Sequence, residues 1–131
     1  MKRLPTRALV LLLVALTAIV IAGCGSSATS AVQKVGAAKA VGMLDSRVVI
    51  DVRTPAEYAA GHIAGARNID VEAADFGAKI SSLDKKASYL VYCHSGRRSA
   101  IAASQMAAAG FTDIVDGGAM ADLVAAGAPT Q

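Results

Sequence analysis

Tryptophan is absent from this 131-residue chain, and aromatic residues make up only 4% of it. Cysteine and histidine are also scarce, with two residues of each. The sequence has no cluster of cysteine and histidine typical of a metal site, so neither a metal nor another cofactor is expected. It has no basic stripe with interleaved aromatic residues, which argues against nucleic-acid binding. Internal repeats are lacking too, and the length suits a single domain.

The net charge of +3 comes from the start of the chain. Lys2, Arg3 and Arg7 precede an apolar run over residues 9–22 that only Thr17 interrupts. This layout is typical of a secretory signal peptide. The other ten basic residues balance ten acidic ones, so the overall basic charge indicates nothing about partners.

Ile21-Ala22-Gly23-Cys24 resembles the bacterial lipobox, in which small residues precede a cysteine that is lipidated. We therefore expect a lipoprotein signal peptide over 1–23, a lipid on Cys24, and a flexible tether over 24–31. The domain over 32–131 would then be anchored to the outer face of the bacterial cell membrane.

Three alternatives for this N-terminal region stay open. The apolar run could be an uncleaved anchor, although it is shorter than the roughly 20 residues that a membrane span needs. Cleavage could also occur without lipidation. A disulfide between Cys24 and Cys93 would be permitted in an exported compartment, but it would close off a candidate nucleophile with a flexible tail.

Beyond the leader, short apolar runs alternate with helical patterns, which predicts an α/β fold with a parallel sheet covered on both sides. Thr54-Pro55-Ala56-Glu57 predicts a helix start with a capping box. Strands are expected at 32–35, 47–52, 89–92 and 113–115 and briefly within 61–69, and helices at 37–44, from 54, 74–81, 100–109 and 119–126.

The polar segment Cys93-His94-Ser95-Gly96-Arg97-Arg98-Ser99 lies between the strand predicted at 89–92 and the helix predicted from residue 100. Backbone N–H groups converge at such a junction, next to the positive end of the helix dipole. These donors, together with Arg97 and Arg98, would favour the anionic form of the Cys93 thiol. The alternative is that Cys93 is only a small buried hydrophobic residue, as many free cysteines are.

Other polar residues have competing interpretations. Asp51 and Arg53 lie at the carboxyl end of the strand predicted at 47–52, where parallel sheets place functional loops, but they could equally form a structural ion-pair set with Glu57. His62 could act as a general base, and we favour the simpler interpretation that it orders a turn through a backbone hydrogen bond.

Three segments carry a family resemblance. The loop from Cys93 to Ser99 resembles the active-site loop of rhodanese-type sulfurtransferases. The stretches 49–58 and 61–69 are also similar to this family, and Val115-Asp116-Gly117-Gly118 resembles its C-terminal glycine pair. The resemblance covers approximately residues 32–129.

The resemblance implies a rhodanese-like three-layer sandwich with a central, mostly parallel sheet of about five strands flanked by helices. It also implies sulfane sulfur transfer from thiosulfate or a similar donor to a thiol or cyanide, through a persulfide on Cys93. The implied donor-binding residues are Asp51, Arg67, His94, Ser95, Gly96, Arg97, Arg98 and Ser99.

One departure from the family concerns the last helix, where many members have a tryptophan. This chain has Asp122 and Leu123 in that region, so pocket shape and substrate preference are less certain than the fold. Two other uses of the scaffold stay open, namely a cysteine phosphatase or arsenate reductase, and a persulfide-carrying binding or sensing module. The phosphatase loops resemble Cys-x5-Arg, whereas Cys93 and Arg98 are spaced as Cys-x4-Arg.

Overall fold

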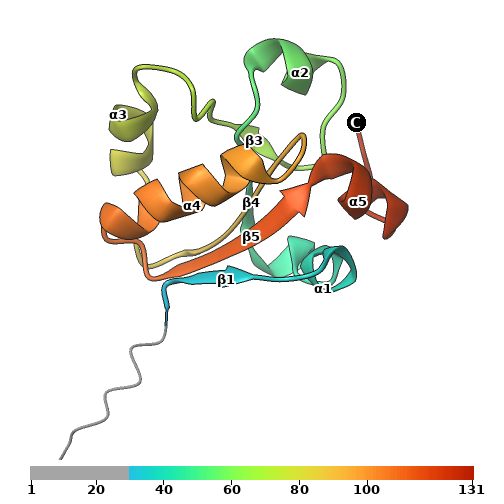
Figure 1. The fold of residues 1–131 in the computed structure, drawn as a ribbon, viewed down its shortest axis with the longest axis horizontal. Coiled ribbons are helices and arrows are strands. Elements are labelled where there is room, and N and C mark those ends of the chain that lie inside the picture. The colour runs from blue at the N-terminus through green and yellow to red at the C-terminus, as the bar shows by residue number, and fades with distance from the viewer. Residues whose placement is uncertain (1–29) are drawn as a thin grey trace, which may run out of the picture.

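A computed structural model describes residues 30–131 of the protein. The predicted leader over 1–23, Cys24 and most of the tether lie outside the described residues. Figure 1 shows strands and helices alternating along the chain. The strands are β1 (Val32–Lys34), β2 (Val48–Asp51), β3 (Arg67–Asn68), β4 (Ser88–Cys93) and β5 (Asp113–Ala119). The helices are α1 (Ala37–Val41), the 3-10 turn η1 (Leu44–Ser46), α2 (Pro55–Ala59), α3 (Phe76–Ser81), α4 (Arg97–Ala108) and α5 (Met120–Ala125).

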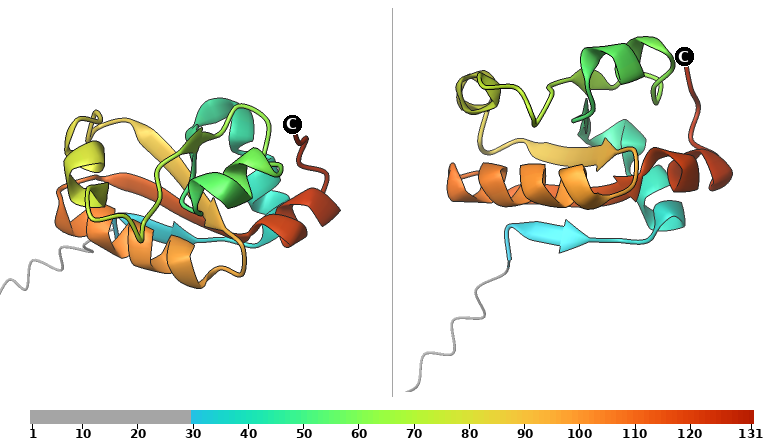
Figure 2. Two further views of the ribbon diagram at one scale, coloured as in Figure 1. Left: turned by 90° about the horizontal axis from the view of Figure 1, so that it is seen from above. Right: turned by 45° about the horizontal axis from the view of Figure 1, so that its top comes forward.

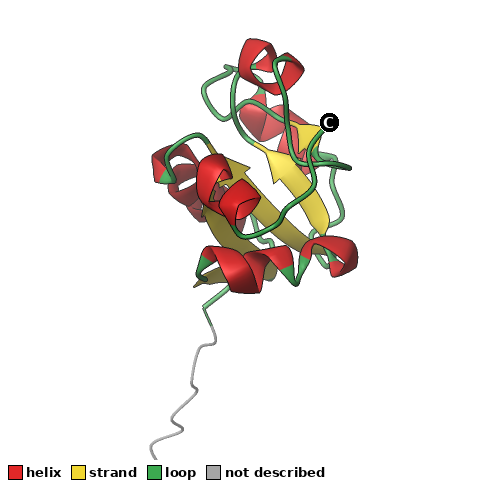
Figure 3. Ribbon diagram, turned by 90° about the vertical axis from the view of Figure 1, so that its right-hand side faces the viewer, coloured by secondary structure: helices red, strands yellow, loops and turns green. Residues whose placement is uncertain are grey.

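The strands form one parallel sheet in the order β1-β5-β4-β2-β3. Helices lie on both sides of it, as Figure 3 shows in red and yellow. The predicted three-layer α/β fold with about five strands is therefore confirmed. β4 occupies the centre, and five consecutive residues from Tyr89 to Cys93 are buried. A strand covered on both faces needs such an uninterrupted apolar run.

Two hydrophobic clusters pack against the two faces of the sheet. One contains Phe76 and Ile80 of α3 together with Met106 of α4, and the Cys93 side chain belongs to it. The other contains Ala40 of α1 and Leu123 of α5. Because neighbouring residues of a strand point to opposite faces, Cys93 and Tyr92 belong to different clusters.

Several predicted boundaries shift in the structure. α4 begins at Arg97 rather than at the predicted Ala100. The sequence pattern did not indicate this first turn, because its polar residues show no apolar periodicity. β5 continues through Gly117 and Gly118 to Ala119, whereas the glycine pair was expected to open the last helix. The pairing with β4 shifts at this point, since Asp116 pairs with Val91 and Gly118 with Tyr92. Glycine permits such a bulge at little steric cost.

The last residues of the chain pair with the loop that follows α2. His62 and Gln131 exchange two backbone hydrogen bonds of 2.9 Å, and Ala64 donates to the Pro129 carbonyl at 2.8 Å. Figure 2 shows the C-terminus beside this loop in both views. Within residues 30–131, no helix has the length and apolar character to cross a membrane.

Candidate active site

The Cys93 sulfur lies at the junction that the sequence predicts, between the end of β4 and the start of α4. The Gly96 N–H donates to the Cys93 Sγ at 3.0 Å. Gly96 has a φ of +92°, a left-handed conformation that favours glycine and that turns its N–H back toward the sulfur. The Ser99 hydroxyl donates to the Gly96 carbonyl at 3.0 Å and so holds the next peptide group of the same residue.

The first turn of α4 supplies further backbone donors beside this junction. Among residues 30–131, no protein acceptor pairs with the backbone N–H groups of Arg97, Arg98 and Ser99. This is expected for the first turn of a helix, where the N–H groups have no intrahelical partner. We call the segment from Cys93 to Ser99 the cradle, because its free donors and the helix dipole favour an anion.

The glycine pair of β5 allows the strand to approach the cradle. A Cβ atom on Gly96 would meet the Gly118 Cα at 3.7 Å and the Ala119 nitrogen at 3.8 Å. One residue earlier, a Cβ on Gly117 would come within 3.0 Å of the Leu90 side chain and 3.3 Å of the Val91 carbonyl. Gly117 therefore leaves room for the Leu90 side chain and the Val91 carbonyl, whereas Gly118 has open space around it and a left-handed φ of +78° that favours glycine.

Cys93 itself has no exposed surface, although the residues that follow it do. His94, Ser95 and Arg97 are exposed, so only the loop separates the sulfur from solvent. The Cys93 side chain packs in a hydrophobic cluster, but its sulfur accepts a backbone N–H, which a purely apolar environment would not supply. The geometry favours the functional interpretation of Cys93, and the size of any reagent should limit its access.

The two cradle arginines have different roles in the structure. Arg98 is half-buried and forms a two-pronged pair with Glu57, with both N···O distances 2.8 Å. It also contacts Glu72 at 3.3 Å. The bond to Glu57 raises the pKa of Arg98, with smaller contributions from Glu72 and Cys93. Arg97 is exposed and forms no ion pair within residues 30–131.

Glu57 connects α2 to α4. It completes the predicted capping box with Thr54 and at the same time accepts from Arg98. Arg98, more than any other group, lowers the pKa of Glu57 to about 2. Glu57 therefore pairs with Arg98 and does not join the ion pair of Asp51 and Arg53, as one interpretation of the sequence had suggested. Sequence reasoning missed the bridge because 41 residues separate its two partners.

Asp51 and Arg53 form a separate, buried network beneath α2. Arg53 donates from Nε and Nη2 to the Asp51 carboxylate at 2.6–3.0 Å, and from Nη2 to the Gly61 carbonyl at 2.7 Å. The Tyr92 hydroxyl donates to Asp51 Oδ2 at 2.7 Å and accepts from the Ile63 N–H. Burial and the Asp51 bond raise the pKa of Tyr92. Asp51 and Arg53 therefore form a buried structural ion pair with each other, without Glu57.

Two further residues can be placed. Arg67 is exposed on the edge strand β3, opposite Ile50. Within residues 30–131, no hydrogen bond or ion pair joins its side chain to the cradle. Its role toward a donor stays a prediction. His62 stacks on Tyr58 with ring centroids 3.6 Å apart, and its Nδ1 lies 3.0 Å from the Tyr58 carbonyl. This is the turn-ordering role expected from the sequence.

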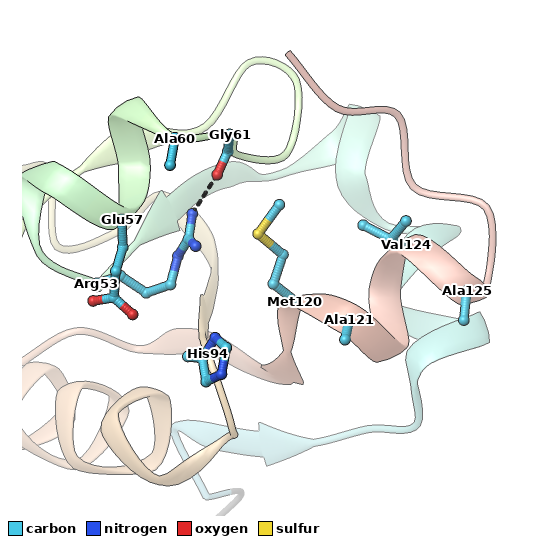
Figure 4. Close-up of a pocket in the computed structure, with 9 residues that line it drawn as sticks. All are labelled: Arg53, Glu57, Ala60, Gly61, His94, Met120, Ala121, Val124 and Ala125. Atoms are coloured by element: carbon cyan, nitrogen blue, oxygen red, sulfur yellow. Dashed lines mark hydrogen bonds between the residues drawn. The ribbon is translucent and has the colours of Figure 1, made fainter.

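A cleft of about 560 Å³ opens beside the cradle, between α2 and α5. Figure 4 shows the His94 imidazole at its foot, with Arg53 and Glu57 on one side and Met120 on the other. Leu123, at the expected tryptophan region, is instead fully buried in the core. The cleft is lined by Arg53, Glu57, Ala60, Gly61, His94, Met120, Ala121, Val124 and Ala125.

The site thus consists of a buried cysteine at a strand–helix junction of a parallel five-stranded sheet, with the Gly96 N–H directed at its sulfur and the first turn of α4 beside it. The chain matches the rhodanese-like domain over residues 27–121. The protein therefore belongs to the rhodanese-like domain family.

Individual relatives agree with this assignment. The thiosulfate sulfurtransferase GlpE of Pseudomonas putida is 44% identical over 77 residues, which span 56% of this chain and 67% of the relative. A rhodanese-like domain from Anabaena superposes with a TM-score of 0.66 at 28% identity, covering 76% of each chain. An Escherichia coli rhodanese solved with anions has a TM-score of 0.56 at 29% identity, covering 65% of this chain and 96% of that one.

Proposed function

We propose that this protein is a sulfurtransferase that moves a sulfane sulfur from thiosulfate or a similar donor to a thiophilic acceptor. The observation that carries the proposal is the Gly96 N–H directed at the Cys93 sulfur from 3.0 Å, within a cradle of free backbone donors. Family membership and the similarity to thiosulfate sulfurtransferases support the same chemistry.

In the first step, the Cys93 thiolate attacks the outer sulfur of thiosulfate. A bond forms between Cys93 Sγ and that sulfur, and the S–S bond of the donor breaks with its electron pair leaving on sulfite. The enzyme keeps a persulfide with an anionic outer sulfur. In the second step, an acceptor such as cyanide or a thiol takes this sulfur and restores the Cys93 thiolate. The cycle is covalent catalysis of the ping-pong type.

The cradle would stabilise both the persulfide and the oxyanion end of the donor. The N–H groups of Arg97, Arg98 and Ser99 start a helix whose dipole favours negative charge. Arg97 is exposed and available for a donor dianion, whereas the Arg98 guanidinium is held by Glu57. We propose that Arg97 attracts the donor and that Arg98 adds a fixed positive charge near the sulfur.

The phosphatase or arsenate reductase alternative needs an arginine free to bind a tetrahedral oxyanion. Here the arginine of the Cys-x4-Arg spacing is Arg98, and both ends of its guanidinium fork bind Glu57. The loop is also one residue shorter than the Cys-x5-Arg pattern. Both observations favour sulfur transfer over phosphoryl chemistry.

Mass spectrometry tests the proposal directly. The full chain carrying Cys24→Ser has Cys93 as its sole cysteine. After treatment with thiosulfate, we expect one added sulfur on Cys93, and thiocyanate should form when cyanide follows. Cys93→Ser in the same background should gain no sulfur. Hydrolysis of a phosphate ester without sulfur uptake would favour the phosphatase, and uptake that no acceptor discharges would favour the sensing module.

We also propose that the chain is exported and lipid-anchored through Cys24 at the outer face of the bacterial cell membrane. The lipobox-like Ile21-Ala22-Gly23-Cys24 after an apolar run supports this. In a bacterial host fed a labelled fatty acid, the wild-type chain should take up label and stay in the membrane fraction. Cys24→Ser should lose the label, and an unlabelled wild-type chain would contradict the proposal.

A further inference from the structure

The cleft between α2 and α5 lies beside the cradle, and His94 belongs to both. The Cys93 side chain packs in the cluster on the α3 and α4 side of the sheet, and the next residue, His94, lines the cleft. The cleft wall is apolar, formed by Met120 and Val124 with three alanines. Val124 is 42% exposed, which makes it one of the large hydrophobic residues that this surface presents to solvent.

Only one side chain in the cleft can take up a proton without first losing a partner. Arg53 is a donor only, and its charge is met by Asp51. Both oxygens of Glu57 accept hydrogen bonds from Arg98, and its low pKa makes it a weak base. His94 is exposed and has no side-chain hydrogen bond within residues 30–131. Imidazole is the side chain best suited to proton transfer near neutral pH.

These features do not suit an anionic donor such as thiosulfate. The wall is apolar, and both charged groups that line it are already paired, Arg53 with Asp51 and Glu57 with Arg98. They suit a neutral molecule with an apolar body and one ionisable group beside His94. The volume of about 560 Å³ lies within the range of roughly 300–1,000 Å³ for small-molecule sites.

We propose that this cleft binds the sulfur acceptor, a small organic thiol with an apolar body, and that His94 is the base that deprotonates it. The inference rests on the proposed function and names the class of its second substrate. The donor then enters at the cradle, and the acceptor enters at the cleft.

The step balances without any external oxidant or reductant. His94 takes the proton of the acceptor thiol, and the resulting thiolate attacks the outer sulfur of the Cys93 persulfide. The bond between Cys93 Sγ and the outer sulfur breaks, and its electron pair stays on Sγ as thiolate. The proton on His94 passes to the transferred sulfur, so the product is a hydropersulfide of the acceptor.

The test compares acceptors that need a base with one that does not. The full chain carrying Cys24→Ser is loaded with thiosulfate, freed of excess donor, and checked for added sulfur by mass spectrometry. Discharge rates are then measured with benzyl mercaptan, with 2-mercaptoethanol, and with tris(hydroxypropyl)phosphine, which takes sulfur without losing a proton. His94→Asn should slow both thiols about a hundredfold, as loss of a general base does, and should leave the phosphine rate within about twofold.

Two matched controls accompany this measurement. His62→Asn replaces the other histidine, outside the cleft, and should leave the ratio of thiol to phosphine rates unchanged. Val124→Asp places a charge in the cleft wall and should reduce the preference for benzyl mercaptan over 2-mercaptoethanol several-fold. Ile101→Asp makes the same kind of change at a residue of α4 that is 41% exposed and outside the cleft, and the preference should persist.

The possible failures can be told apart. Absence of added sulfur on Cys93 would overturn the proposed function and this inference together. Normal loading with equal slowing of thiols and phosphine in both His94→Asn and His94→Gln would show that His94 only positions the loop. Normal loading with an unchanged thiol preference in Val124→Asp would show that the acceptor binds elsewhere.

Discussion

Two arginine–carboxylate pairs lie near the candidate active site, and they differ in burial. The side chains of Arg53 and Asp51 are 6% and 0% exposed, whereas those of Arg98 and Glu57 are 19% and 32% exposed. The buried pair also binds Tyr92 of β4 and the Gly61 carbonyl, so it joins the central strands to the α2 loop. The outer pair joins α2 to the first turn of α4. The inner pair thus maintains the architecture, and the outer pair maintains the position of the cradle.

The largest effect should come from breaking the inner pair. Asp51→Ala leaves the Arg53 charge buried without its partner and removes the acceptor of the Tyr92 hydroxyl. We expect a loss of about 3–5 kcal/mol in the free energy of unfolding, measured by urea denaturation. Asp75→Ala is the matched control, because its ion pair with Lys79 is more than half exposed and should contribute under about 1 kcal/mol. Equal losses of unfolding free energy in the two variants would mean that the buried pair contributes no more to stability than an exposed one.

The cradle can also be disturbed without breaking either ion pair, by changing the glycine in its turn. Gly96→Ala forces a left-handed residue to carry a Cβ, which should cost about 1–2 kcal/mol of unfolding free energy and reduce sulfur uptake by Cys93. The new Cβ would meet its neighbours at ordinary contact distances, so backbone strain alone is tested.

Gly77→Ala is the control for this variant, since Gly77 lies in α3 with open space around its Cα and no positive φ. It should stabilise the protein by up to about 1 kcal/mol. Full sulfur uptake by the Gly96→Ala variant would mean that the cradle tolerates a side chain at this position and that its left-handed backbone does not require glycine.

The outer pair should make stability depend on pH. The folded-state pKa of Glu57, about 2, lies below its ordinary value of 4.5. Its contribution is therefore complete above about pH 4.5 and is lost as the pH falls toward 2. Solvent screening limits that contribution to about 1 kcal/mol. Urea denaturation of wild type and Glu57→Gln across this pH range should converge at the acid end, and a constant difference would contradict the assignment.

The smallest effect on stability is expected from the arginine outside both pairs. Arg97→Ala should leave the free energy of unfolding within about 0.5 kcal/mol, because Arg97 is exposed. It should instead lower kcat/KM for thiosulfate several-fold at low salt, and added salt should shrink the difference. A salt-independent effect would indicate a role other than attraction of the donor.

The sequence predicted what depends on neighbouring residues. The parallel sheet, the capping box of Thr54 and Glu57, and the position of Cys93 at a strand–helix junction all follow from local patterns and are present in the structure. The start of α4 was misplaced by three residues, because Arg97, Arg98 and Ser99 form a helical turn without an apolar stripe. Their helical state follows from the Gly96 turn and from the Glu57 contact.

What depends on distant residues could not be predicted. The bridge from Arg98 to Glu57, the hydrogen bond from Tyr92 to Asp51, and the cleft wall of Met120 and Val124 all join elements far apart in the chain. The bulge in β5 has a local signal in its glycine pair, but that signal suits a helix start equally well. The pairing of Gly118 with Tyr92 and the approach of Gly117 to Leu90 distinguish the two.

The pairing of the chain end with the loop after α2 has a practical consequence. Gln131 and Pro129 bind the backbone at His62 and Ala64, next to Gly61, whose carbonyl holds Arg53. Changes within residues 129–131 would thus loosen the loop that carries Gly61, one of the residues that line the cleft.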